Sequence, residues 1–327
     1  MVRFGVVGTS RIVDEFIRCA KLHSEFSLNA VYSRTKEQGR IFAERHGIKN
    51  RFISLEEMAQ SDQIDAVYIA SPNSLHAEQA VLFMYYGKHV LCEKPIASNR
   101  RELSMMVESA RHHQVLLMEA MKSTFLPNFQ AVKQNLHKIG AVRKFFSNFC
   151  QYSSRYDAYK MGEIPNAFNP VLSNGSIMDI GVYCIYPAIY LFGKPKKVIA
   201  NGILLDSGVD GAGSIVLHYS DKEVIISHSK ITNSQVSNEI QGEEGSIVID
   251  KISTPKMVKI FYNNGSSEDI GQEQCNDFMY YEVKEFIHLI NKHKIESNIN
   301  SLQLSLDVME VIDECRKQIG IAFPADM

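Results

Sequence analysis

Short apolar runs alternate with amphipathic stretches over the first 120 residues of the chain. The apolar runs have the length and composition of buried strands, and the amphipathic stretches carry apolar residues three and four positions apart, which predicts helices. This alternation is typical of a parallel βαβ array. The predicted strands are Val2–Val7, Leu28–Tyr32, Arg51–Ile53, Ala66–Ala70, His89–Cys92 and Val115–Glu119, and the predicted helices begin at Arg11, Lys36, Ser54, His76 and Asn99.

The pattern changes after residue 120. Alternating segments at hairpin spacing follow between residues 196 and 262, and they predict an open, mainly antiparallel sheet. The other predicted elements are a helix over Pro127–Lys138, a strand over Val142–Gln151, a polar loop over Ser153–Asn174, an apolar helix over Ser176–Phe192 and closing helices over Asp277–Lys294 and Leu302–Ile319. We therefore predict an α/β protein with a doubly wound nucleotide-binding domain over residues 1–120 and an α+β domain over residues 121–327.

A turn of small residues, Gly8-Thr9-Ser10, joins the first predicted strand to the helix that begins at Arg11. Free N–H groups and the positive end of the helix dipole point at such a turn, which favours binding of a pyrophosphate. Ser10 and Val13 stand where the dinucleotide motif G-x-G-x-x-G has its second and third glycines. A plain strand–helix turn is the alternative interpretation.

The end of the second strand indicates the type of dinucleotide. An acidic residue there binds the ribose hydroxyls of NAD, but this chain has Ser33-Arg34-Thr35. A hydroxyl, a guanidinium and a helix N-terminus suit a 2′-phosphate, so we predict a preference for NADP, with NAD as the second choice. A solvated basic turn is the alternative.

Polar residues also follow the fourth and fifth strands, at the carboxyl edge that faces the ligand in open α/β sheets. Asn73, in Ser71-Pro72-Asn73, is predicted to cap a helix, to contact the cofactor, or both. His76 falls in the first turn of that helix, where a surface or capping histidine is the simpler interpretation. Lys94, in Glu93-Lys94-Pro95, points toward the nicotinamide end and suits a substrate hydroxyl or carbonyl. A surface lysine in a proline turn is its alternative.

Asp179 and Tyr183 lie four residues apart in the apolar helix and therefore share a face. A carboxylate and a phenol are costly to bury without a partner. Tyr183 suits proton transfer if a cation such as Lys94 lowers its pKa, and Asp179 suits binding a substrate hydroxyl or orienting Lys94. An exposed acid and an ordinary core tyrosine are the alternative.

Composition narrows the class of protein. The 327 residues are 45% hydrophobic and 22% charged with a net charge of −2, which indicates neither a nucleic-acid nor a membrane partner. No signal peptide and no apolar run long enough to span a bilayer are found, so we predict a cytoplasmic protein. The six cysteines are scattered without metal-type spacing, which predicts free thiols in a reducing compartment and no metal site.

Together these stretches resemble the glucose–fructose oxidoreductase / inositol dehydrogenase / rhizopine catabolism family, over essentially the whole chain, and most closely the branch of dimeric dihydrodiol dehydrogenase. The motifs that carry the resemblance are Gly5-x-x-Gly8-Thr9-x-Arg11-Ile12, Ser33-Arg34-Thr35, Ser71-Pro72-Asn73-x-x-His76, Glu93-Lys94-Pro95, Met118-Glu119-Ala120 and Gly175-x-x-x-Asp179-x-Gly181-x-Tyr183. The resemblance implies a Rossmann domain that holds the cofactor through Gly8, Thr9, Ser10, Arg11, Ile12, Ser33, Arg34, Thr35, Ser71, Pro72, Asn73, His76, Glu93 and Lys94.

The resemblance also implies hydride transfer between nicotinamide C4 and a CH–OH or C=O carbon of a sugar, a polyol or a cyclic diol. Tyr183 would move the hydroxyl proton, Lys94 would stabilise the developing alkoxide and Asp179 would position the substrate. The chain would pair into a dimer or tetramer through its open sheet. A non-catalytic, nucleotide-binding regulator of the same fold and a reductase of a non-sugar carbonyl are the alternatives.

Overall fold

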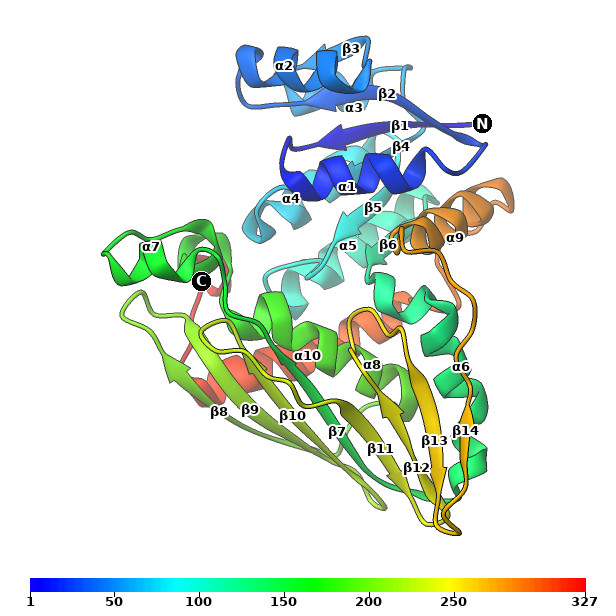
Figure 1. The fold of residues 1–327 in the computed structure, drawn as a ribbon. Coiled ribbons are helices and arrows are strands. Elements are labelled where there is room, and N and C mark those ends of the chain that lie inside the picture. The colour runs from blue at the N-terminus through cyan, green and yellow to red at the C-terminus, as the bar shows by residue number, and fades with distance from the viewer. The chain divides into compact units, whose positions relative to one another are not determined.

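The computed structural model describes residues 1–327 and divides the chain into two compact units (Figure 1). Unit 1 consists of residues 1–121 and 275–303, and unit 2 consists of residues 122–274 and 304–327. Each unit is built around one sheet, of six strands in unit 1 and eight in unit 2.

The sheet of unit 1 is parallel throughout and has the strand order β3-β2-β1-β4-β5-β6. The order reverses between β1 and β4, and in open α/β sheets ligands bind at the carboxyl edge beside such a reversal. The predicted doubly wound sheet is thereby confirmed. Its strands are β1 (Val2–Val7), β2 (Phe26–Tyr32), β3 (Asn50–Phe52), β4 (Ala66–Ile69), β5 (His89–Glu93) and β6 (Leu117–Ala120).

Three helices of unit 1 begin at side chains that cap them. Thr35 and Ser54 accept the first free N–H groups of α2 and α3, and Asn99 caps α5. Ser98, the residue before Asn99, donates its backbone N–H to the Glu102 carboxylate at 2.9 Å. The helices are α1 (Arg11–Ala20), α2 (Lys36–His46), α3 (Leu55–Gln60), α4 (His76–Tyr85), α5 (Arg100–His113) and α9 (Tyr280–Asn291).

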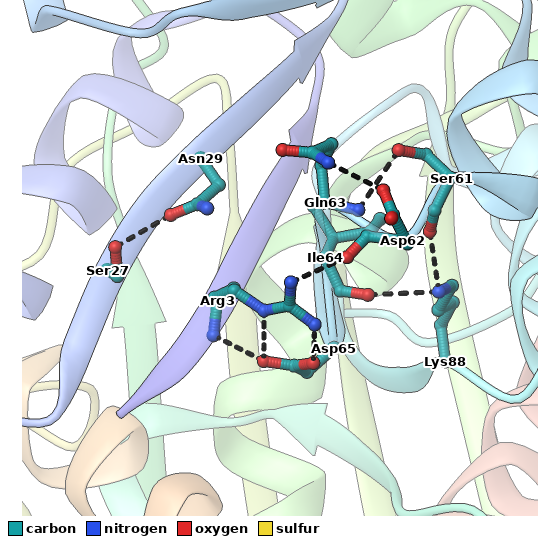
Figure 2. Close-up of polar contacts among 9 residues, drawn as sticks. All are labelled: Arg3, Ser27, Asn29, Ser61, Asp62, Gln63, Ile64, Asp65 and Lys88. Carbon is teal, nitrogen blue, oxygen red and sulfur yellow. Dashed lines mark hydrogen bonds and ion pairs between the residues drawn. The ribbon is translucent and has the colours of Figure 1, made fainter.

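An ion pair closes the amino edge of this sheet (Figure 2). Arg3, at the start of β1, binds the carboxylate of Asp65 through Nε at 3.0 Å, and its backbone N–H donates to the same carboxylate at 2.9 Å. Lys88, just before β5, donates to the carbonyl oxygens of Ser61 and Ile64 at 2.7 and 3.0 Å. These charges fix strand ends at the edge of the sheet opposite to the turn that follows β1.

The sheet of unit 2 has the order β14-β13-β12-β11-β7-β10-β9-β8. Every neighbouring pair is antiparallel except β7 and β10, which confirms the predicted, mainly antiparallel sheet. The short strand β14 has no counterpart in the predicted elements. The strands are β7 (Val142–Cys150), β8 (Lys197–Leu204), β9 (Asp210–His218), β10 (Glu223–Ser229), β11 (Asn238–Gly242), β12 (Gly245–Ile249), β13 (Val258–Tyr262) and β14 (Ser267–Asp269).

Helices cover one face of this sheet: α6 (Pro127–Asn135), α8 (Val182–Phe192) and α10 (Leu302–Ile319) lie along it (Figure 1). Alternate residues of β10, Val224 and Ile226, are fully buried on this side, as the period of a half-buried strand requires. Ile225, between them, points to the other face and is half-buried.

Two expectations for the segment before α8 need correction. The predicted polar loop contains a short helix, α7 (Tyr156–Lys160), and two 3₁₀ turns, at Asn166–Phe168 and Pro170–Leu172. The apolar helix begins with a π-helical turn at Ile177–Gly181 before α8. The sequence analysis expects no apolar run long enough to span a bilayer, but the segment Pro170–Phe192 has the length and composition to do so. In its 18-residue apolar window, 78% is buried inside the protein, as in the core helix of a globular domain.

Candidate functional site

The turn after β1 packs closely against the end of β4 because Gly8 has no side chain. Its φ is +113°, and a Cβ there would lie 3.0 Å from the carbonyl oxygen of Ala70. Ser10 is the N-cap residue of α1, but its hydroxyl makes no capping bond, and Ser10 and Arg11 are exposed. The turn thus presents helix N–H groups and an uncommitted hydroxyl, which suits a pyrophosphate. Val13 is fully buried and packs beneath the turn.

Ser33-Arg34-Thr35 follows β2 and leads into α2. Ser33 is buried, whereas Arg34 and Thr35 are exposed. The Thr35 hydroxyl accepts the Gln38 N–H at 3.3 Å and caps the helix. An exposed guanidinium beside a helix N-terminus provides the charge and donors that a phosphate requires.

His76 is buried at the start of α4, so the simpler interpretation of a surface histidine is wrong. Its Nδ1 lies 3.0 Å from the carbonyl oxygen of Pro95 and its Nε2 lies 2.9 Å from that of Ser71. Burial lowers the pKa of His76 to about 4, so the ring is neutral and donates one N–H to one of these oxygens. His76 therefore links the loop after β4 to the loop after β5.

Two buried carboxylates hold the backbone around Lys94. The Glu93 carboxylate accepts the Tyr68 hydroxyl and, at 3.2 Å, the N–H of Lys94. The Glu119 carboxylate, at the end of β6, accepts the N–H of Ile96 at 3.2 Å. The Lys94–Pro95 peptide bond is cis. Side chains from β5, α4 and β6 therefore lie against the backbone of three successive residues, Lys94, Pro95 and Ile96.

In unit 2, Asp179 lies on the π-helical turn and Tyr183 on the first turn of α8. The Asp179 side chain is 41% exposed, and its Oδ2 accepts a hydrogen bond from Nζ of Lys230 at 2.7 Å. Tyr183 is half-buried, and its ring centroid lies 5.7 Å from that of Phe149 on β7. A carboxylate held at the surface beside a phenol suits recognition of a hydroxylated substrate.

A buried polar cluster fixes the start of the π-helical turn. The Asp210 carboxylate accepts the N–H groups of Ser176 and Ile177 at 3.0 and 2.8 Å, and the Ser176 hydroxyl lies 2.9 Å from Nδ1 of His228. Burial raises the pKa of Asp210 to about 6 and lowers that of His228 to about 4. The residue types are those of a nucleophilic triad, but all three are buried, so the cluster supports the turn.

Sequence reasoning missed Asp210, His228 and Lys230 because each lies in the strand region and has no motif of its own. The only local signal is Gly175, since its φ is +137° and a Cβ there would lie 2.5 Å from Oδ1 of Asp210. Gly175 belongs to the family motif that also contains Asp179 and Tyr183, but the sequence does not show which side chain packs against this glycine.

The fold and the polar residues at these strand and helix ends define a dinucleotide-dependent oxidoreductase class, and comparison with known proteins gives the family. The model described as "Oxidoreductase family, NAD-binding Rossmann fold" matches residues 2–121, and the GFO/IDH/MocA C-terminal domain matches residues 129–248. The chain belongs to the GFO/IDH/MocA oxidoreductase family, which confirms the resemblance inferred from its motifs.

Individual relatives cover the whole chain. Scyllo-inositol 2-dehydrogenase (NADP(+)) IolU of Bacillus subtilis is 54% identical over 100% of this chain and 99% of its own length. Trans-1,2-dihydrobenzene-1,2-diol dehydrogenase of mouse is 29% identical over 99% of each chain. The structure of KijD10, a 3-ketoreductase from Actinomadura kijaniata, in complex with NADP and TDP-benzene, has a TM-score of 0.86 at 23% identity and covers 97% of this chain and 98% of that one.

Proposed function

We propose that the protein is an NADP-dependent dehydrogenase of cyclic polyols, with scyllo-inositol or a closely related inositol as substrate. The observation that carries the proposal is the 54% identity, over its full length, with the scyllo-inositol 2-dehydrogenase of Bacillus subtilis. Residues 1–120 would bind the dinucleotide, and residues 121–327 would bind the substrate and pair with a second copy. Free cysteines throughout support a reducing compartment, and we place the enzyme in the cytoplasm.

The residues of unit 1 fit a phosphorylated dinucleotide. Gly8 allows the tight turn against Ala70, and the first turn of α1 offers its N–H groups to the pyrophosphate. Arg34 supplies an exposed cation for the 2′-phosphate, and no carboxylate stands in the Ser33-Arg34-Thr35 turn to repel it. Thr9, Ile12, Ser71, Pro72, Asn73 and Glu93 complete the proposed contacts. NADP is therefore the preferred cofactor and NAD the second choice.

A nicotinamide held by these residues of unit 1 would supply the hydride acceptor for oxidation of the substrate carbinol carbon. Tyr183 takes the hydroxyl proton as the C–H bond breaks, so the carbinol becomes a carbonyl. The Lys94 ammonium stabilises the developing negative charge on the substrate oxygen. Asp179 accepts a hydrogen bond from a neighbouring substrate hydroxyl and sets the orientation of the ring. The reverse sequence reduces an inosose to the inositol.

The test combines binding and turnover. Calorimetric titration with NADPH and with NADH measures the cofactor preference, and absorbance at 340 nm follows oxidation of scyllo-inositol, myo-inositol and a cyclic diol. We expect tighter binding of NADPH and turnover of an inositol that falls sharply in Tyr183→Phe while NADPH binding stays intact. Cofactor binding without oxidation of any polyol or diol would favour a nucleotide-binding regulator instead.

The open face of the unit 2 sheet supports a homodimer. Ile199, Val216, Ile225 and Phe146 are paired in register across β8, β9, β10 and β7 and form one apolar row, and Ile199 is 38% exposed. A contiguous apolar row on an open sheet face is typical of a protein interface. Ile225→Lys should reduce the mass measured by light scattering to that of the monomer, and an unchanged mass would place the interface elsewhere.

A further inference from the structure

We infer that Lys230 is a positioning residue that orients Asp179, and the inference rests on the proposed function in which Asp179 binds the substrate. Lys230 follows β10, and its side chain is only 3% exposed. Lysine is almost never buried in this way unless its charge is paired. The residue therefore has a specific task in the fold, and its contacts indicate which.

The Lys230 ammonium has partners on two segments. Nζ donates to Oδ2 of Asp179 at 2.7 Å and to the carbonyl oxygen of Ala167 at 3.2 Å. It also lies 5.2 Å from the ring centroid of Phe168, within the range of a cation–π interaction. Lys230 therefore ties the segment before α8 to the carboxylate on the π-helical turn.

The backbone on both sides of this ion pair is fixed. The N–H of Lys230 donates to the carbonyl oxygen of Gly211, and its own carbonyl accepts the N–H of Ser153, both at 2.8 Å. On the other side, Asp210 holds the N–H groups of Ser176 and Ile177 at the start of the turn that carries Asp179. The position of the ammonium is therefore set by the sheet, and that of Asp179 by a capped turn.

This arrangement fixes the plane of the carboxylate and leaves it accessible. A carboxylate has about four lone-pair directions and can accept hydrogen bonds from Lys230 and from a substrate hydroxyl together. Asp179 is 41% exposed, whereas Lys230 is buried behind it. Lys230 thus acts through Asp179 and without touching the substrate. An error of about 1 Å in the position of a binding group costs on the order of 100-fold in rate.

The kinetic test compares Lys230→Met with Lys230→Arg in the full-length, NADP-bound enzyme. Methionine keeps the apolar stem without the charge, so we expect KM for the inositol to rise about 10-fold and kcat/KM to fall 10- to 100-fold. The Kd of NADPH should stay within twofold, and arginine should recover part of KM. A variant that is only partly folded has a smaller fraction of active enzyme, which lowers the apparent kcat and leaves KM unchanged. An unchanged KM in Lys230→Met, or no recovery with arginine, would overturn the inference.

Lys222→Met is the matched control, since Lys222 pairs with Asp221 at 2.7 Å and faces the Phe192 ring in the same unit, away from Asp179. We expect its KM to equal that of the wild type. An equal rise in KM in both variants would also overturn the inference.

Thermal unfolding tests the pair without any substrate. Asp179→Ala leaves a buried ammonium unpaired, whereas Lys230→Met leaves a carboxylate that water reaches, so Asp179→Ala should lower Tm more. The double variant should melt no lower than Asp179→Ala. If the loss of Tm in the double variant equals the sum of the losses in the two single variants, the two residues are not coupled and the inference is overturned. Failure of the wild type to oxidise any polyol would instead refute the proposed function, and the unfolding comparison would still decide whether the pair is coupled.

Discussion

Nδ1 of His76 lies 3.0 Å from the carbonyl oxygen of Pro95, and this contact joins α4 to the loop that carries Lys94. The neighbouring Ile96 is held through its N–H by Glu119. The main chain on the carboxyl-terminal side of Lys94 is therefore bound by two side chains from different elements. Rigid support of this kind is what a catalytic group needs to keep its geometry through turnover.

Replacing His76 by alanine should lower kcat of the proposed inositol reaction on the order of 10- to 100-fold, because the loop that carries Lys94 loses the imidazole that lies against Pro95. Steady-state kinetics and NADPH titration measure the effect. If His76 acts through Lys94, the Kd of NADPH changes little; a large rise in that Kd would show that His76 contacts the cofactor, as the family resemblance implies. His112→Ala, at the exposed end of α5, is the control and should match the wild type.

Local signals explain how much of the fold was predictable. The start of α2 at Lys36 matches the expectation because Thr35 caps it, and Gly47, with a φ of +72°, ends the helix after His46. The limits of α10 also match. In contrast, residues 275–303 return to unit 1, where Phe286 packs 5.8 Å from the Phe4 ring. A contact between residues so far apart in the chain leaves no periodic signal.

The candidate site was predictable only where a motif exists. Lys94, Asp179 and Tyr183 lie in recognisable motifs, and the predicted roles of these residues stay predictions. Lys230 stands in a polar stretch at the end of a strand, where lysine is ordinarily exposed. Its burial depends on Asp179 and Phe168, which only the folded unit brings to it. The π-helical turn was missed for the same reason, since its support comes from Asp210.

Acid should destabilise the protein through its buried histidines. The pKa values of His76 and His228 fall from 6.5 to about 4 on folding, so between these pH values the unfolded chain binds protons that the native state does not. Stability is therefore lost as pH falls from 6.5 toward 4, by up to about 3 kcal/mol for each histidine. The raised pKa of Asp210, about 6, acts in the opposite sense, because the native state holds that proton more tightly.

His228→Asn removes the contribution of His228 to the pH dependence of stability. An amide can still form a hydrogen bond with the Ser176 hydroxyl, so the contact itself is kept. Urea unfolding at a series of pH values between 6.5 and 4 gives the slope of the free energy of unfolding against pH. Unfolding of the variant should take up as much as one proton fewer than unfolding of the wild type. Its free energy of unfolding should therefore change with pH less steeply, by up to about 1.4 kcal/mol per pH unit. Equal slopes would mean that His228 titrates alike in the folded and unfolded chains.

Replacing Arg34 by alanine should weaken NADPH binding about 10- to 100-fold, because a charge-assisted hydrogen bond contributes about 1.5–3 kcal/mol. The Kd of NADH should stay within about twofold, since NADH has no 2′-phosphate. Calorimetric titration with both cofactors measures the difference. Arg40→Ala is the control, because Arg40 lies on α2, which follows this turn, and pairs with Glu37 and Glu44. Equal losses for NADPH and NADH in Arg34→Ala would refute a 2′-phosphate site at this turn.

The carboxyl terminus of the chain should depend on Arg316 for its stability. The Arg316 side chain on α10 is 4% exposed. Its guanidinium binds the carboxylate of Asp313 at 2.8 Å and that of Asp326 at 2.8 and 3.1 Å. The central carbon of the guanidinium lies 4.4 Å from the centroid of the Phe323 ring. Both carboxylates are about 30% exposed, so removing the arginine leaves them in water rather than stranded.

We therefore expect Arg316→Met to cost about 2 kcal/mol, from the lost charge-assisted bonds, and to release the residues after α10. Urea unfolding measures the cost, and limited proteolysis with carboxypeptidase measures the release. Lys317→Met, at the neighbouring exposed position, should change neither. A resistant tail in Arg316→Met would show that the apolar burial of Ile321 and Phe323 is enough to hold this segment.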